Sequence, residues 1–153
     1  MTTATATAAA FCPVSLERVD HNAVRVTGLL TVAMLAAYAI SGWAVFAIVL
    51  AADYTVRAWT GGRSPMQRLG GRIARGLGIP ALMQDKAPKQ FAARIGWMFA
   101  VAASVLAFVS PTAGIVVGLS LLGFNVLDSV FDFCVGCWTY IHMVLPLSAR
   151  FGR

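Results

Sequence analysis

The chain has 153 residues, of which 59% are hydrophobic and only 12% are charged, and its formal net charge is +6. Soluble domains are about half apolar and a quarter charged, so this composition excludes an ordinary soluble domain and indicates that lipid surrounds much of the chain. The positive charge then serves to orient helices and to contact anionic lipid head groups, and we expect no nucleic-acid partner.

The apolar stretches predict an all-α, polytopic membrane protein, because about 20 apolar residues are needed to cross a bilayer as a helix. We expect a disordered tail at residues 1–12 and one transmembrane domain at 13–150. Four transmembrane helices are predicted, at about 24–41, 43–59, 91–109 and 112–133. Turns at Ser41-Gly42 and at Ser110-Pro111 pair them into two hairpins. The segment Trp138–Leu147 is interpreted as an overlong or interfacial end of the fourth helix.

The loop between the hairpins contains a predicted amphipathic helix at about 65–76. Ser64 is a typical helix cap, and proline is favoured at the first helical position. Three arginines, Arg68, Arg72 and Arg75, recur at helical spacing. The opposite face carries Met66, Leu69, Ile73 and Leu77. This pattern favours a helix on the inner leaflet whose arginines bind anionic lipid, and the alternative is a solvated basic loop.

All 12 basic residues lie in the N-terminal segment, in the central loop and its flanks, or at the C-terminus. Neither hairpin turn contains one. Because basic residues stay on the cytoplasmic side during insertion, we expect both termini and the central loop to face the cytoplasm. The expected location is a bacterial plasma (inner) membrane.

Three cysteines are the residues most suited to chemistry. Cys134 and Cys137 form a Cys-x-x-Cys pair, a spacing that allows a disulfide or two thiolate ligands to one metal. Cys12 precedes the first predicted helix, and Cys134 and Cys137 come at the end of the fourth. All three cysteines therefore lie at the predicted cytoplasmic face. A cytoplasmic location favours redox or metal chemistry over a permanent disulfide. The alternative is that the cysteines are ordinary packing residues.

Two pairs of charged residues lie near predicted helix ends. Asp53 and Arg57 have ion-pair spacing, and we interpret them as an anchor for the end of the second helix; the alternative is a polar wall facing the cysteine site or a proton path. Asp128 and Asp132 come just before the cysteines. Their negative charge is expected to raise the thiol pKa values.

The remaining polar and small residues suggest packing. We interpret His21 and His142 as interfacial, although one histidine added to the three cysteines would complete a four-ligand zinc site. Asn125 is expected to form a hydrogen bond between helices, and Gly114 and Gly118 predict a close helix contact.

Several motifs in order give a family resemblance. The segments that carry it are Phe11-Cys12-Pro13-Val14-Ser15, Asp53 with Arg57, Ser64-Pro65, residues 88–96 (PKQFAARIG) and Phe133-Cys134-Val135-Gly136-Cys137. With these motifs the chain resembles the bacterial membrane proteins grouped as a four-helix domain of unknown function, over about residues 11–141. The resemblance implies no established activity. It points to Cys12, Cys134, Cys137, Asp53 and Arg57 as the site, and family members are often encoded near thioredoxin-like or sulfur-handling proteins.

The first functional hypothesis is thiol-disulfide redox or electron transfer at Cys134 and Cys137, with Cys12 as a third thiol and a quinone or a thioredoxin-like protein as partner. The second is binding of zinc, copper or sulfur by the same three cysteines. The third is a non-catalytic accessory subunit of an oligomer or membrane complex. The sequence requires no cofactor, and it leaves open whether the protein is an enzyme.

Overall fold

The structure is a computed structural model, and it describes residues 18–60 and 62–144. Most of these residues are helical, as predicted. The elements in chain order are β1 (Arg18–Asp20), α1 (His21–Ser41), α2 (Ala44–Trp59), α3 (Pro65–Gly76), β2 (Met83–Asp85), α4 (Lys86–Val109), α5 (Pro111–Val130), α6 (Val135–Thr139) and the π-helix η1 (Tyr140–Val144).

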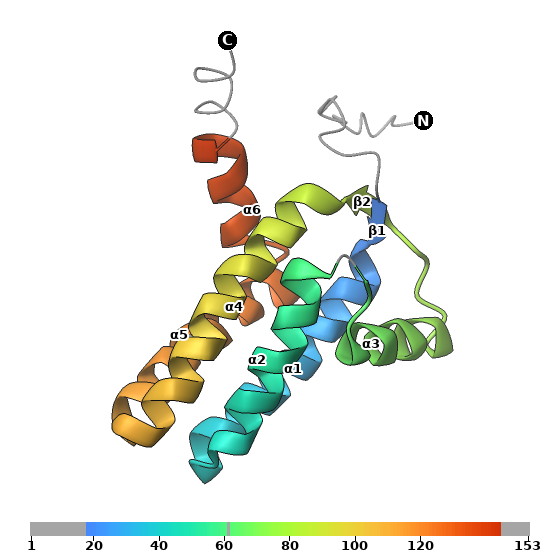
Figure 1. The fold of residues 1–153 in the computed structure, drawn as a ribbon. Coiled ribbons are helices and arrows are strands. Elements are labelled where there is room, and N and C mark those ends of the chain that lie inside the picture. The colour runs from blue at the N-terminus through green and yellow to red at the C-terminus, as the bar shows by residue number, and fades with distance from the viewer. Residues whose placement is uncertain (1–17, 61, 145–153) are drawn as a thin grey trace, which may run out of the picture.

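Helices α1, α2, α4 and α5 lie side by side in an elongated bundle, in which α1 packs on α5, α2 on α4, and α4 on α5 (Figure 1). Gly42 ends α1 in the left-handed conformation (φ 68°), and its N–H donates to the Tyr38 carbonyl oxygen at 2.8 Å. Pro111 begins α5 directly after Ser110. Both predicted hairpin turns are therefore confirmed, and they lie together at the end of the bundle away from β1, β2 and α6.

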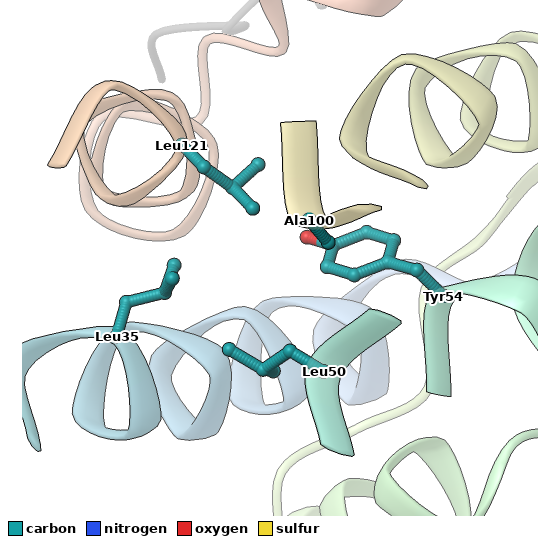
Figure 2. Packing of buried hydrophobic residues seen from close by; sticks show 5 residues of the cluster. All are labelled: Leu35, Leu50, Tyr54, Ala100 and Leu121. Carbon is teal, nitrogen blue, oxygen red and sulfur yellow. The ribbon is translucent and has the colours of Figure 1, made fainter. Parts of the chain in front are cut away.

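The core is formed where the four long helices meet. Figure 2 shows its central side chains pointing toward one another, and these are Leu35, Leu50, Tyr54, Ala100 and Leu121. Gly114 and Gly118 of α5 face Tyr38 of α1, with no room for a further carbon atom beside Gly114. The predicted close contact at these glycines is confirmed, because only a residue without a Cβ lets the neighbouring helix approach so far.

Three helices, α1, α4 and α5, are long and apolar enough to cross a membrane. Many large apolar side chains on the bundle surface are exposed, including Ile40 (88%), Phe108 (73%) and Val109 (77%). Such a surface is costly in water and favourable in lipid. Helix α2 has 16 residues, fewer than the roughly 20 that a crossing needs, so the fourth transmembrane helix stays a prediction.

The two short strands, which the sequence did not predict, join the starts of two helices. β1 pairs antiparallel with β2, with Arg18 opposite Asp85. Asp20 caps α1 by accepting from the Asn22 N–H at 3.1 Å, and it also accepts from the Leu82 N–H at 3.3 Å. This pairing brings the first turn of α1 beside the first turn of α4.

The last long helix is shorter than predicted. It ends at Val130, where the N–H groups of Phe131 and Phe133 both donate to the Leu127 carbonyl oxygen. Asp132 then takes a positive φ of 58°, a conformation that aspartate tolerates better than most residues. The chain turns there and begins the separate helix α6, so the cysteine pair does not lie on a continuation of the fourth helix.

Candidate functional site

The Cys-x-x-Cys pair lies at the start of α6. Cys134 is the N-cap of this helix, and its Sγ accepts a hydrogen bond from the backbone N–H of Cys137 at 3.3 Å. Both cysteines are free thiols and half-buried. Gly136 between them touches α4 so closely that a Cβ would lie 2.6 Å from the Ala92 Cβ. Glycine at this position therefore lets α6 and its two thiols lie directly against α4.

The pKa values of the two thiols shift in opposite directions. A hydrogen bond from the Cys137 thiol is the main reason why the pKa of Cys134 lies below its ordinary value, and the Cys137 N–H and the Lys89 charge act in the same direction. The same hydrogen bond, together with burial, raises the pKa of Cys137. Asp128 raises the pKa of both thiols, as predicted, but for Cys134 the prediction of a raised pKa was wrong because the donors outweigh this carboxylate.

His21 links α4 to the turn before α6. Its Nδ1 lies 2.6 Å from the Lys89 Nζ, and its Nε2 lies 2.6 Å from the Asp132 Oδ1. A lysine ammonium can only donate, so Nδ1 accepts and the Nε2–H faces the Asp132 carboxylate. His21 is only 4% exposed, and its interpretation as a residue at the membrane interface stays a prediction. Within the protein, His21 positions Lys89, whose charge acts on Cys134.

Asp53 and Arg57 form the predicted ion pair, and it is buried. The Asp53 Oδ2 and the Arg57 Nη2 are 2.5 Å apart. The other oxygen of Asp53 accepts from the Met66 N–H at 3.1 Å, and Arg57 donates to the Ser64 Oγ at 3.3 Å. Ser64 in turn completes a capping box with Gln67, which confirms the predicted start of α3. The pair therefore ties the start of α3 to α2, and neither charge shifts the pKa of Cys134 or Cys137.

The same end of the bundle contains two further predicted residues. Asn125 accepts a hydrogen bond from the Tyr54 hydroxyl at 3.1 Å, which confirms the expected bond between helices. His142 lies on η1, exposed, and its ring stacks on Trp138 at 4.7 Å between centroids. Its interfacial interpretation stays a prediction.

The third cysteine of the hypotheses, Cys12, lies outside the described residues. Between residues 18 and 144, apart from residue 61, no three His, Cys, Asp or Glu side chains are grouped so that they can hold a metal ion. His21 is occupied by Lys89 and Asp132. In the described part of the chain, the candidate site therefore consists of the Cys134 and Cys137 thiols, with Lys89 as their cationic neighbour.

Sequence reasoning missed Lys89 and the positioning role of His21. Lys89 belongs to the PKQFAARIG segment on which the family resemblance depends. A lysine within a family motif, with no structural role evident from the sequence, could have indicated a residue of the site. Nothing in the sequence indicates the contact with His21, because 68 positions separate the two residues. The contact depends on the β1–β2 pairing that joins the starts of α1 and α4.

Fold and surface define a helical protein with three helices able to cross a membrane, which fits a membrane protein. Within that class, the chain belongs to the family described as a domain of unknown function (DUF4395), whose model matches residues 19–144. This match confirms the resemblance seen in the sequence. Comparison with curated proteins and with solved structures gave no match.

Proposed function

We propose that the protein is a membrane-bound thiol–disulfide exchange protein in which Cys134 is the attacking thiol and Cys137 is the resolving thiol. The observation that carries this proposal is the position of Cys134 as the N-cap of α6, where its Sγ accepts a hydrogen bond from the Cys137 N–H at 3.3 Å, whereas Cys137 lies inside the helix. The opposite directions of the two pKa shifts agree with this position. The thiolate is the nucleophile in exchange, and a lowered pKa gives Cys134 more thiolate near neutral pH. The raised pKa keeps the proton on Cys137 until the first step has occurred.

The exchange then takes two steps. The Cys134 thiolate attacks one sulfur of a partner disulfide, forms a mixed disulfide and releases the other partner sulfur as a thiolate. Cys137 loses its proton and attacks the Cys134 sulfur, which releases the second partner thiolate. Two electrons pass from the Cys134–Cys137 pair to the partner, whose two sulfurs end as thiols. A thioredoxin-like protein is the proposed partner, and the same steps run in reverse.

We also propose the full predicted topology: four transmembrane helices in a bacterial plasma membrane, with both termini and α3 on the cytoplasmic side. Trp43 and Trp59, which flank α2, are both exposed, and tryptophans at helix ends are typical of the membrane interface. All 12 basic residues lie away from the two hairpin turns. These features support a crossing by α2 despite its length.

Helix α3 is proposed to lie at the inner leaflet. Leu69 and the C-cap residue Leu77 are 47% and 70% exposed. Met66 packs against the core and Ile73 is half-buried, so the bundle covers only part of the apolar face. The arginines at positions 68, 72 and 75 are exposed as well. A helix with exposed leucines and arginines gains from contact with an anionic lipid surface, about 1 kcal/mol for each basic residue.

The test of the exchange proposal uses glutathione disulfide on the purified chain in a Cys12→Ser background. The wild-type pair is expected to pass through a glutathione adduct to the Cys134–Cys137 disulfide. Cys137→Ala is expected to stop at the Cys134–glutathione adduct, because the resolving thiol is missing. Mass spectrometry of the peptide that contains both positions distinguishes these products.

Cys134→Ser is the matched control, because its hydroxyl still accepts the hydrogen bond from Cys137. In this variant Cys137 remains half-buried, and we expect adduct formation to be at least about tenfold slower than at Cys134 in Cys137→Ala. Equal rates in the two variants would contradict the assignment of roles. Failure of the wild-type chain to form the internal disulfide would rule out exchange by this pair.

A further inference from the structure

A large cavity lies between α3, the first turns of α1 and α4, and the start of α6. Its volume is about 830 Å³, near the upper end of the range for sites that bind small molecules. Cys134 lines one side and the arginines of α3 line another, and the cavity extends inward to Leu121 of the core. Helix α3 packs on α1 whereas α6 packs on α4, so the cavity spans the gap between these two short helices.

The cavity wall is strongly cationic. Eight basic side chains line it and only two acidic ones, Asp20 and Asp128. The Asp20 carboxylate already accepts from the backbone N–H groups of the α1 cap and of Leu82. Asp128 lies toward the thiols, since its charge acts on Cys134 and Cys137. The positive charge near α3 is therefore not balanced from within the cavity.

Three of the eight basic residues, Arg68, Arg72 and Arg75, lie on α3. Arg57 is paired with Asp53, and Lys89 is held by His21. In contrast, none of the three α3 arginines forms an ion pair with a carboxylate whose position the structure describes. Guanidinium groups match the planar, two-oxygen edge of carboxylates and phosphates. These arginines therefore form a subsite suited to an oxyanion.

The inner wall is apolar. Val24, Ile95, Phe99, Leu121 and Phe124 line this part of the cavity, and the Phe99 and Phe124 rings pack edge to face at 5.5 Å between centroids. A small inorganic anion would leave this wall uncovered. A ligand with an apolar portion would bury it, which is favourable at about 25 cal/mol per Å².

We propose that the cavity binds a single-chain amphiphilic anion. A phosphate, sulfate or carboxylate head group lies among the arginines of α3, and the apolar chain lies between α1, α4 and α5. The site is distinct from the surface contact of α3 with lipid head groups, because it encloses the apolar chain of the ligand within the protein. Binding does not require a thiol at position 134, although a ligand in the cavity is expected to limit access to Cys134.

Decyl phosphate is the probe, and the full chain is studied in a neutral maltoside detergent by native mass spectrometry and by titration. We expect one molecule to bind saturably, and we expect Arg72→Gln to weaken the affinity by roughly tenfold or more, as for loss of one hydrogen bond between charged groups. Arg94→Gln is the matched control, since it removes the same charge from a residue that stacks on Trp59 outside the cavity. Equal weakening by both variants would overturn the proposal.

A competition experiment identifies which part of the ligand the cavity recognises. Inorganic phosphate is expected to compete only at far higher concentration than decyl phosphate, because it cannot cover the apolar wall. Competition at equal concentration would show a simple anion site and would refute the amphiphile.

The position of the ligand is read from Cys134. Saturating decyl phosphate should slow alkylation of Cys134 by iodoacetamide at least about threefold, because this thiol lines the cavity. An unchanged rate would place the ligand elsewhere and overturn the proposal. Cys134→Ser should still bind decyl phosphate, so that failure of the exchange function and failure of this site give different results.

Discussion

At the scale of single residues, the position of each thiol relative to α6 decides its chemistry. Cys134 caps the helix, and its sulfur accepts hydrogen bonds from both the thiol and the backbone N–H of Cys137. Cys137 lies inside the helix and donates its thiol hydrogen to the same bond, which raises its own pKa. Two identical side chains three positions apart thus acquire different acidities from one turn of backbone.

The difference predicts a particular pH profile for Cys134. Because its pKa lies below the ordinary value, the thiolate persists as the pH falls through the range in which an ordinary cysteine becomes protonated. We expect the alkylation rate of Cys134 to reach half its maximum at a lower pH than the rate of the same residue in the denatured chain. Peptide mass spectrometry after timed iodoacetamide treatment measures both.

The variants at position 137 test the cause of that shift. Cys137→Ala removes the thiol donor, so the midpoint should move to higher pH. Cys137→Ser keeps a hydroxyl donor at the same place and should move it less. If the Cys137→Ala profile coincides with that of the wild-type chain, the thiol hydrogen bond is not the main cause of the low pKa.

At the scale of elements, α3 depends on a buried charge pair. Asp53 is 7% exposed, and it holds both Arg57 and the Met66 N–H at the start of α3. Removing one partner of a buried pair leaves an unpaired charge, which typically costs about 3–5 kcal/mol. Asp53→Asn is expected to lower the free energy of unfolding by this amount, as measured by chemical denaturation in detergent.

The double variant Asp53→Asn/Arg57→Gln separates the charge pair from the rest of the contact. It should cost clearly less than the sum of the two single variants, because no charge is then left unpaired. Arg94→Gln, an exposed arginine that stacks on Trp59, serves as the control and should change stability by under about 1 kcal/mol. Additive losses would show that Asp53 and Arg57 act separately.

The contact of α5 with α1 and α4 makes a second prediction at this scale. A Cβ on Gly114 would lie 2.7 Å from the Tyr38 hydroxyl and 2.9 Å from the Ala107 backbone nitrogen. Since a helix backbone cannot move aside cheaply, Gly114→Ala should destabilise the protein by about 1–3 kcal/mol. Thermal unfolding in detergent measures the change.

Gly123 on the same helix is the matched control. A Cβ there meets no atom within 4 Å, so Gly123→Ala should be neutral or should stabilise the helix by up to about 1 kcal/mol. A similar loss in both variants would mean that glycine matters to α5 for flexibility, with no role for close packing.

At the scale of the whole molecule, we predict that α2 crosses the membrane. If it does, Ser41 and Thr112 in the hairpin turns lie outside the cell, and Leu82 between α3 and β2 lies inside. We expect Ser41→Cys and Thr112→Cys, each in a chain without its native cysteines, to react with an impermeant maleimide on intact cells. Leu82→Cys should react only after the membrane is opened.

All three positions are exposed in the structure, so a lack of labelling reports the side of the membrane. Labelling of Leu82→Cys and Ser41→Cys from the same side would show that α2 does not cross. The predicted four-helix topology would then reduce to the three helices that are long enough.

The sequence alone determined those properties of this protein that depend on neighbouring residues. Runs of apolar residues predicted the long helices, and Pro111 and Gly42 predicted the turns, because backbone restrictions act locally. The start of α3 at Ser64-Pro65 and the Asp53–Arg57 pair were also readable, since capping and ion-pair spacing span only a few positions.

Only the tertiary structure decided how distant segments meet. The end of α5 depends on Asp132 in a left-handed conformation, which no local pattern required. The contact of His21 with Lys89 and the acidity of Cys134 arise where β1 pairs with β2 and α6 packs on α4. Burial, hydrogen bonding and charge at these places are set by residues far apart in the chain, so a reading of local spacing cannot supply them.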